Sequence, residues 1–182
     1  VLISKLNSGL TTLTQSTFLG DTGTDRAYSL AIDSSGNIYV AGETSSTAYP
    51  GVSGGAQSTK GSGIDVVISK LTPSLKILTQ STFLGGTGTD KARAITIDSS
   101  DNIYVAGETS STDYPGVSGG PQTTNGGGID VLISKLNSGL TTLTQSTYLG
   151  GTSTDVAYSV IVNSGNVYVA GETASAAYPG GS

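Results

Sequence analysis

Residues 32–44 read IDSSGNIYVAGET, and this stretch decides the fold class. Its Ser-Gly-Asn segment supplies residues that tolerate positive φ in a tight turn, and its Ile-Tyr-Val-Ala segment is rich in β-branched and aromatic side chains. The same stretch returns as IDSSDNIYVAGET at residues 97–109 and as VNSGNVYVAGET at residues 162–173, with one turn residue deleted. It therefore predicts a β-hairpin that occurs three times in the chain.

The repetition extends beyond this hairpin over the whole chain. Val1, Val66 and Val131 begin equivalent segments that are 65 residues apart. The first and third of these segments are identical from the starting valine to the next glycine after Leu19, except at Phe18, which is tyrosine in the third. No segment shows helical periodicity, and each repeat contains short alternating stretches separated by turn residues. We therefore expect an all-β protein.

Four short antiparallel strands in each repeat are typical of a β-propeller blade. Numbered from the propeller axis outward, we expect the inner strand at residues 26–33, the second at 38–44, the third at 66–71 and the outer strand at 77–84. The outer strand is polar, as suits an edge that faces solvent. A β-solenoid is the alternative, but its coils usually repeat every 20 to 30 residues or so, and therefore far more often than this sequence does.

The composition excludes several classes of function. The chain contains no Cys, His, Met or Trp, and its net charge is −5. Without Cys or His there is no disulfide, no thiolate zinc site and no Ser-His-Asp or Cys-His catalysis. We therefore expect no transition metal and no nucleotide cofactor. Because no basic run occurs, nucleic acid and anionic membranes are poor partners, and no apolar stretch approaches the roughly 18 residues of a membrane span.

The repeat also resembles a known family. Its pattern is Asp-Val-x-Ile-Ser-Lys-Leu, then Ser-Thr-Phe/Tyr-Leu-Gly-Gly, then the hairpin stretch, then Asp/Ala-Tyr-Pro. This pattern resembles the bacterial β-propeller repeat abbreviated SBBP, for seven-bladed β-propeller, over essentially the whole chain. The resemblance implies a propeller in a secreted or cell-surface protein, and it carries over no catalytic or binding residues. The chain departs from the family in having three repeats where the family name implies about seven.

The position of the first strand predicts how the blades are divided along the chain. We expect a single propeller segment, residues 1–182, that starts at a third strand and ends after a second strand. Its parts are an outer half-blade at 1–20, blades at 26–84 and 91–149, and an inner half-blade at 156–182. The absence of an initiator Met and the strand-like opening are typical of a processed product or an excerpt of a longer protein.

Three four-stranded blades are too few to close a ring, because propellers typically have four or more. The unpaired half-blades would expose strand edges and apolar faces. Two copies joined head to tail would give six complete blades. We therefore expect a homodimer in which the final inner hairpin of each chain pairs with the initial outer hairpin of its partner.

Three aspartates, Asp25, Asp90 and Asp155, immediately precede the predicted inner strands, at the expected mouth of the channel. The run GGTGTDKA at residues 85–92 matches one copy of a calcium-binding nonapeptide, although that motif works through consecutive copies that share each ion. A hard cation such as Ca²⁺ is therefore one interpretation of the three aspartates. The alternative, which we favour, is that each aspartate caps its own glycine-rich loop.

Further candidate residues gather at the same end of the strands. The second strands end in a glutamate, and each long loop that follows contains a Tyr-Pro pair; these residues are Glu43, Glu108, Glu172, Tyr49, Tyr114 and Tyr178. Carboxylates, tyrosines and the longest loops on one face are typical of a propeller binding face. The alternative is that the tyrosines pack between blades. Arg93 replaces Tyr28 and Tyr158 on its inner strand, so its guanidinium must find a partner or reach the channel.

These patterns favour a non-enzymatic scaffold or adhesion module outside the cell or on its surface, binding a surface protein or a glycan through the long-loop face. A carbohydrate-binding propeller is an alternative and would need exposed stacking tyrosines. A polysaccharide-degrading enzyme is a third and would need one asymmetric pair of acids in a cleft. Acids repeated in every blade suit structure or ion binding better than they suit a single active site.

Overall fold

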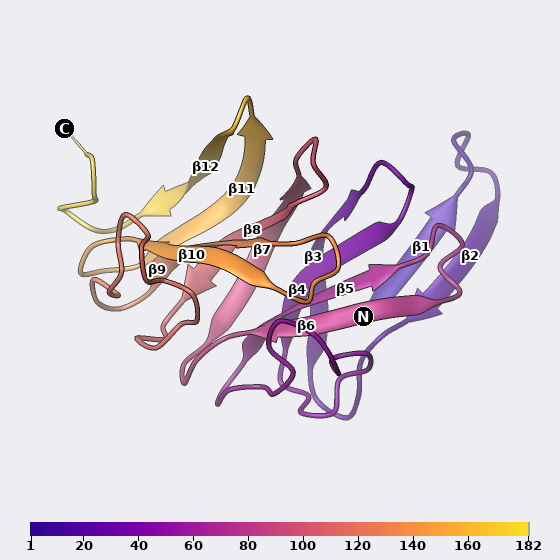
Figure 1. The fold of residues 1–182 in the computed structure, drawn as a ribbon, viewed down its shortest axis with the longest axis horizontal. Helices are drawn as coiled ribbons and strands as arrows, with labels where there is room; N and C mark the ends of the chain where they lie inside the picture. Colours follow the sequence, from indigo (N-terminus) through magenta and orange to yellow (C-terminus); the bar gives the residue numbers. More distant parts are fainter. Residues whose placement is uncertain (182) are drawn as a thin grey trace.

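The computed structural model describes residues 1–181 and contains twelve β-strands (Figure 1). Ser182, the last residue of the predicted terminal half-blade, lies outside the described residues. Within residues 1–181 no helix is long and apolar enough to cross a membrane. The strands are β1 (Leu2–Leu6), β2 (Leu13–Phe18), β3 (Asp25–Ile32), β4 (Ile38–Thr44), β5 (Asp65–Leu71), β6 (Leu78–Leu84), β7 (Asp90–Ile97), β8 (Ile103–Thr109), β9 (Asp130–Leu136), β10 (Leu143–Leu149), β11 (Asp155–Asn163) and β12 (Asn166–Thr173).

The strands form two four-stranded sheets and two two-stranded sheets, all antiparallel. The four-stranded sheets have the orders β3-β4-β5-β6 and β7-β8-β9-β10, and the two-stranded sheets are β1-β2 and β11-β12. The all-β class and the strand order within the blade-like sheets are therefore confirmed. Figure 1 shows the sheets following one another in chain order, with β1-β2 at one end of the series and β11-β12 at the other.

The hairpin turn between β3 and β4 explains why its sequence recurs. Asp33 Oδ1 accepts hydrogen bonds from the backbone N–H groups of Ser35 and Asn37 at 3.0 and 2.8 Å, and Asn37 Nδ2 donates to Asp33 Oδ2 at 2.9 Å. Gly36 has a φ of 82°, which glycine adopts without steric cost. Asp98 makes the same three contacts in the next repeat, so the turn is held by its aspartate rather than by a bound group.

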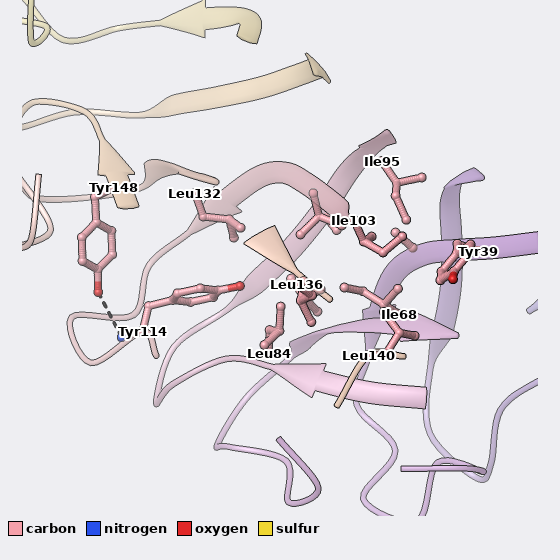
Figure 2. Close-up of a cluster of buried hydrophobic side chains, with 14 residues drawn as sticks. Tyr39, Ile68, Leu84, Ile95, Ile103, Tyr114, Leu132, Leu136, Leu140 and Tyr148 are labelled. Carbon is pink, nitrogen blue, oxygen red and sulfur yellow. Dashed lines mark hydrogen bonds between the residues drawn. The ribbon is translucent and has the colours of Figure 1, made fainter. Parts of the chain in front are cut away.

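The largest core cluster lies between the two four-stranded sheets. It joins Tyr39 and Ile68 of the first sheet to Ile103 and Leu132 of the second (Figure 2). Tyr148 is fully buried; its hydroxyl donates to the carbonyl oxygen of Ser111 and accepts from the N–H of Tyr114, both at 3.0 Å. Buried tyrosine hydroxyls need such partners. Face-to-face packing of neighbouring sheets is therefore what forms the core.

Candidate functional site

Each inner strand, β3, β7 and β11, contains a β-bulge at the same place. The bulge leaves one residue of each inner strand without a partner on the neighbouring strand; these residues are Tyr28, Arg93 and Tyr158. Gly42 lies opposite the first bulge, where an added Cβ would come 1.8 Å from the carbonyl oxygen of Arg26. The bulge therefore requires the glycine of the recurring Ala-Gly-Glu segment. It also changes the direction in which the side chain of the bulged residue points.

Charged side chains beside these bulges form a chain of ion pairs across neighbouring sheets. Arg26 Nη1 lies 2.6 Å from Glu43 Oε1 on the next strand. Lys91 Nζ lies 3.7 Å from Glu43 Oε2 of the preceding sheet and 3.1 Å from Glu108 Oε1 of its own sheet. Glu43 and Glu108 are buried, so each predicted glutamate is neutralised by at least one cation. Lys91 thus links the two four-stranded sheets electrostatically.

Arg93 finds both a carboxylate and an aromatic partner. Its Nη2 lies 3.0 Å from Glu108 Oε1, and its guanidinium carbon lies 4.7 Å from the centroid of the Tyr28 ring. Burial opposes the charge of Arg93, but the hydrogen bond and attraction of Glu108 outweigh burial and raise its pKa. This distance is within the range of a cation–π contact. The replacement of tyrosine by arginine in this repeat therefore ties β7 to β3.

The third glutamate has a different partner because Val156 stands where the other inner strands carry Arg26 and Lys91. Tyr158 Oη donates to Glu172 Oε1 at 2.8 Å, and this hydrogen bond raises the pKa of Tyr158. Both side chains are exposed. We call the whole group the inner-strand cluster; its members are Arg26, Tyr28, Glu43, Lys91, Arg93, Glu108, Tyr158 and Glu172.

The aspartates that begin the inner strands turn into the protein. Asp90 Oδ2 accepts from Gly86 N–H at 3.0 Å and from Ser111 Oγ at 2.7 Å, and its other oxygen accepts from Thr109 Oγ1. Asp155 and Asp25 have the equivalent partners in their own loops. The hydrogen bonds are those expected of the loop-cap alternative.

The burial of these aspartates differs among the three repeats. Asp90 and Asp155 are fully buried. Burial raises the pKa of Asp90, whereas for Asp155 the hydrogen bonds from Thr173, Gly151 and Ser175 outweigh burial and lower the pKa. Among residues 1–181 no three Asp or Glu side chains lie close enough together to hold a metal ion by themselves. Hydrogen bonds within each loop therefore account for the repeated placement of the three carboxylates.

The tyrosines of the long loops also lie in places that the binding-face interpretation did not expect. Tyr49 and Tyr114 are 3% and 2% exposed, and their hydroxyl groups lie 3.4 and 3.3 Å from the Oγ atoms of Ser69 and Ser134. Burial raises the pKa of Tyr49 to about 12. Only Tyr178, beside the two-stranded sheet β11-β12, is partly exposed. Tyr49 and Tyr114 are therefore core residues and offer no ring face for stacking on a ligand.

Two aspartates that the sequence analysis did not single out begin the third strands. Asp65 and Asp130 are fully buried, and each accepts a hydrogen bond of 2.7 Å from the N–H of a loop glycine, Gly61 or Gly126. Burial raises the pKa of Asp65 to about 6. The signal for these residues was present in the sequence, because the pattern Gly-x-Gly-Ile-Asp ends both long loops.

Most of the carboxylates described above are held in ion pairs or hydrogen bonds, so few of them are free to act as catalytic groups. Glu43 and Glu108 are paired with the three cations of the inner-strand cluster, Glu172 accepts from Tyr158, and Asp25, Asp90 and Asp155 are loop caps. A general acid or base must exchange a proton with a bound substrate. Carboxylates engaged in this way serve to hold strands and loops together.

Comparison with known families agrees with the repeat structure. Residues 16–50 and 81–115 match the family SBBP, described as a beta-propeller repeat. Two segments of the chain are therefore similar to SBBP repeats. Each matched segment runs from the outer strand of one sheet into the first two strands of the next, so the SBBP sequence repeat joins two neighbouring sheets. No curated protein matches the chain.

Proposed function

We propose that this SBBP-repeat protein is a non-enzymatic scaffold, secreted or at the cell surface, whose sheets join end to end with those of a second copy to complete a six-bladed propeller. The observation that carries the proposal is the pair of two-stranded sheets at the ends of the series. The sheet β1-β2 lacks the inner two strands of a blade, and β11-β12 lacks the outer two. The two ends are therefore complementary.

The apolar surface of the end sheets supports this assembly. Phe18 is 79% exposed, whereas its counterpart in the next repeat, Phe83, is fully buried. Tyr168 is 53% exposed, whereas its counterpart Tyr39 is fully buried. A groove of about 200 Å³ beside β12 is lined by apolar residues such as Val131 and Val169 together with Glu172 and Thr173. Exposed apolar groups in this pattern favour association with a surface of the same kind.

The register of the proposed contact follows from the two four-stranded sheets. Ile103 and Glu108 of β8 pair with Leu136 and Val131 of β9. Because β12 and β1 repeat these strands, β12 of one chain is expected to pair with β1 of its partner in the same register. Val167 would then lie opposite Leu6 of the partner subunit. Such strand addition provides main-chain hydrogen bonds along both free edges.

The scaffold would present its long loops, residues 45–64 and 110–129, to a partner protein. These loops are anchored at both ends by buried aspartates, for example by Asp90 and Asp130, which supports a rigid surface. The carbohydrate-binding alternative receives no support from Tyr49 and Tyr114, because both rings are buried. The hydrolase alternative receives none from the paired glutamates.

Light scattering coupled to size exclusion tests the assembly directly. We expect the unmodified protein to have twice the mass of one chain and Phe18→Asp to have the mass of one chain. Ile77→Asp is the matched control, because Ile77 is 60% exposed on the turn between β5 and β6 and belongs to neither end sheet. A folded unmodified protein with the mass of one chain at micromolar concentration would overturn the proposed ring.

A further inference from the structure

The two long loops end in equivalent turns that differ in one charged residue. The first turn reads Lys60-Gly-Ser-Gly-Ile-Asp65 and the second reads Asn125-Gly-Gly-Gly-Ile-Asp130. Gly63 and Gly128 have φ values of 67° and 68°, and Ile64 and Ile129 each form a parallel bridge to the loop before the next inner strand. The turns therefore share the backbone at their last glycine and isoleucine, whereas Gly127 has a φ of 127° and its counterpart Ser62 has no positive φ; Lys60 has Asn125 as its counterpart.

In the first turn the lysine ammonium lies among three oxygen atoms. Lys60 Nζ donates to the carbonyl oxygens of Gly61 and Gly63 at 2.9 and 2.6 Å and lies 3.9 Å from Asp65 Oδ1. The side chains of Lys60 and Asp65 are only 5% and 0% exposed. This position is therefore a buried, oxygen-lined place for a positive charge.

In the second turn the equivalent oxygens have no cation from the protein. The counterparts of the three oxygens are Gly126 O, Gly128 O and Asp130 Oδ1, and Asp130 is fully buried. Within the described residues, neither Asp130 Oδ1 nor the buried Nδ2 of Asn125 has a hydrogen-bond partner; Asp65 Oδ1 also lacks one but lies 3.9 Å from the Lys60 ammonium. Asn125 instead uses its amide oxygen to accept from Gly127 N–H at 2.8 Å. A buried carboxylate oxygen without a partner, such as Asp130 Oδ1, lowers the stability of the folded protein.

A second carboxylate increases the negative charge at this turn. Asp130 Oδ1 and Asp155 Oδ2 lie 2.4 and 2.8 Å from the position that a Cβ on Gly150 would occupy, so the two oxygens face the same glycine. In the first turn, Lys60 offsets the corresponding pair, Asp65 and Asp90. The second turn has the neutral Asn125 in place of Lys60, so it has one positive charge fewer than the first turn.

We propose that the turn Asn125–Asp130 binds a hard cation, Ca²⁺ or one of similar chemistry, at the position that the Lys60 ammonium occupies in the preceding repeat. Asp130 Oδ1 and the carbonyl oxygens of Gly126 and Gly128 supply protein ligands, and water completes the coordination shell. Oxygen-only ligands of this type suit Ca²⁺, which takes carboxylate and backbone carbonyl oxygens together. This site differs from the one considered at Asp25, Asp90 and Asp155, whose carboxylates are already used as loop caps.

Exchanging the two residues that distinguish the turns tests the proposal. We expect calorimetric titration with Ca²⁺ to give one site per chain in the unmodified protein, with a dissociation constant on the order of 10⁻⁴ to 10⁻³ M, as in extracellular calcium modules. Asn125→Lys should abolish that site, because the introduced ammonium takes its place. Lys60→Asn should create a second site by removing the ammonium from the first turn.

Thermal unfolding provides an independent measurement. About 10 mM Ca²⁺ should raise the Tm of the unmodified protein by about 3–8 °C over the value in chelator. Asn125→Lys should show the raised Tm in chelator and no further response to Ca²⁺. Substitution with Mg²⁺ or with K⁺ at the same ionic strength distinguishes Ca²⁺ from a smaller divalent or a monovalent ion.

Two results would overturn the proposal. One is Ca²⁺ binding that persists unchanged in Asn125→Lys, because the ion would then lie elsewhere. The other is the absence of binding of any of the three cations by the unmodified protein. A protein that binds no cation but is stabilised by Asn125→Lys would indicate that water alone joins Asn125 to Asp130.

Discussion

The hairpins β1-β2 and β9-β10 have the same sequence except that Phe18 of the first is Tyr148 in the second. Their side chains nevertheless differ sharply in exposure to solvent. Leu2 and Phe18 of the first are 61% and 79% exposed, whereas their counterparts Leu132 and Tyr148 are fully buried. The difference arises because β9-β10 continues a sheet that β7 and β8 begin, and that sheet packs against its neighbour. Burial in this fold is therefore a property of position in the series and not of the repeat sequence.

Truncating the equivalent aromatic residues should give the largest contrast. We expect Phe83→Ala to lower the free energy of unfolding by about 3–5 kcal/mol, because it leaves a cavity in a packed core. Phe18→Ala should change it by less than about 0.5 kcal/mol when the protein is dilute enough to be monomeric, because Phe18 then faces solvent. Urea unfolding at several protein concentrations measures both. Equal losses for the two variants in dilute protein would contradict the assigned burial.

The pH dependence of stability should differ between the four-stranded sheet that contains β5 and the end sheet β1-β2. Asp65 begins β5, whereas β1 begins at Leu2 and has no aspartate within the strand. Burial raises the pKa of Asp65 to about 6 from an ordinary value of 3.8. Between these values the folded protein holds a proton that the unfolded chain has released. The contribution of Asp65 to the free energy of unfolding is therefore fully present below about pH 3.8 and is lost as the pH rises through 6.

Comparison with Asp65→Asn isolates that effect from the other carboxyl groups. Relative to the unmodified protein, the variant should gain up to about 3 kcal/mol between pH 4 and pH 7, since one pKa unit corresponds to about 1.4 kcal/mol. Chemical denaturation at several pH values measures the difference. Parallel stability curves for the two proteins would show that Asp65 titrates normally.

The aspartates that cap the loops should show a smaller difference in stability between a buried and a partly buried position. Asp90→Asn should cost about 2 kcal/mol, because an amide has only one acceptor oxygen and cannot accept both from Gly86 and Ser111 on one side and from Thr109 on the other. Asp25→Asn should cost less, since Asp25 is only partly buried and one of the groups that it accepts from, the N–H of Asp21, is exposed. Thermal unfolding of the two variants side by side checks the order, and the reverse order would contradict it.

The smallest expected effect concerns the residue that distinguishes the middle inner strand. Arg93→Tyr restores the residue found at the other two bulges and removes the pair with Glu108. We expect a loss of about 0.5–1 kcal/mol at low salt, because Arg93 is partly exposed and water screens the pair. The loss should shrink in about 1 M NaCl, which shortens the screening length. A loss that does not depend on salt would assign the contribution to packing on Tyr28.

The repeat sequence by itself determined the local structure of this protein. The 65-residue spacing, the alternation within each stretch and the Asp-Ser-Ser-Gly-Asn turn are local features, so they predicted the strands, their order within a sheet and the hairpin turns. The capping of loops by Asp25 and Asp90 was also foreseeable, because the glycine-rich loops beside them offer many N–H groups. These predictions depend on residues close together in the chain.

The tertiary structure decided which repeated residues are buried and which partners they have. The sequence left open whether Tyr49 and Tyr114 face solvent or pack between blades, and they pack into the core because their loops fold back over the third strand of their own sheets. Lys91 joins Glu43 and Glu108 only because neighbouring sheets lie side by side. Identical repeat sequences cannot encode whether another sheet covers them, and that contact sets burial, charge pairing and pKa.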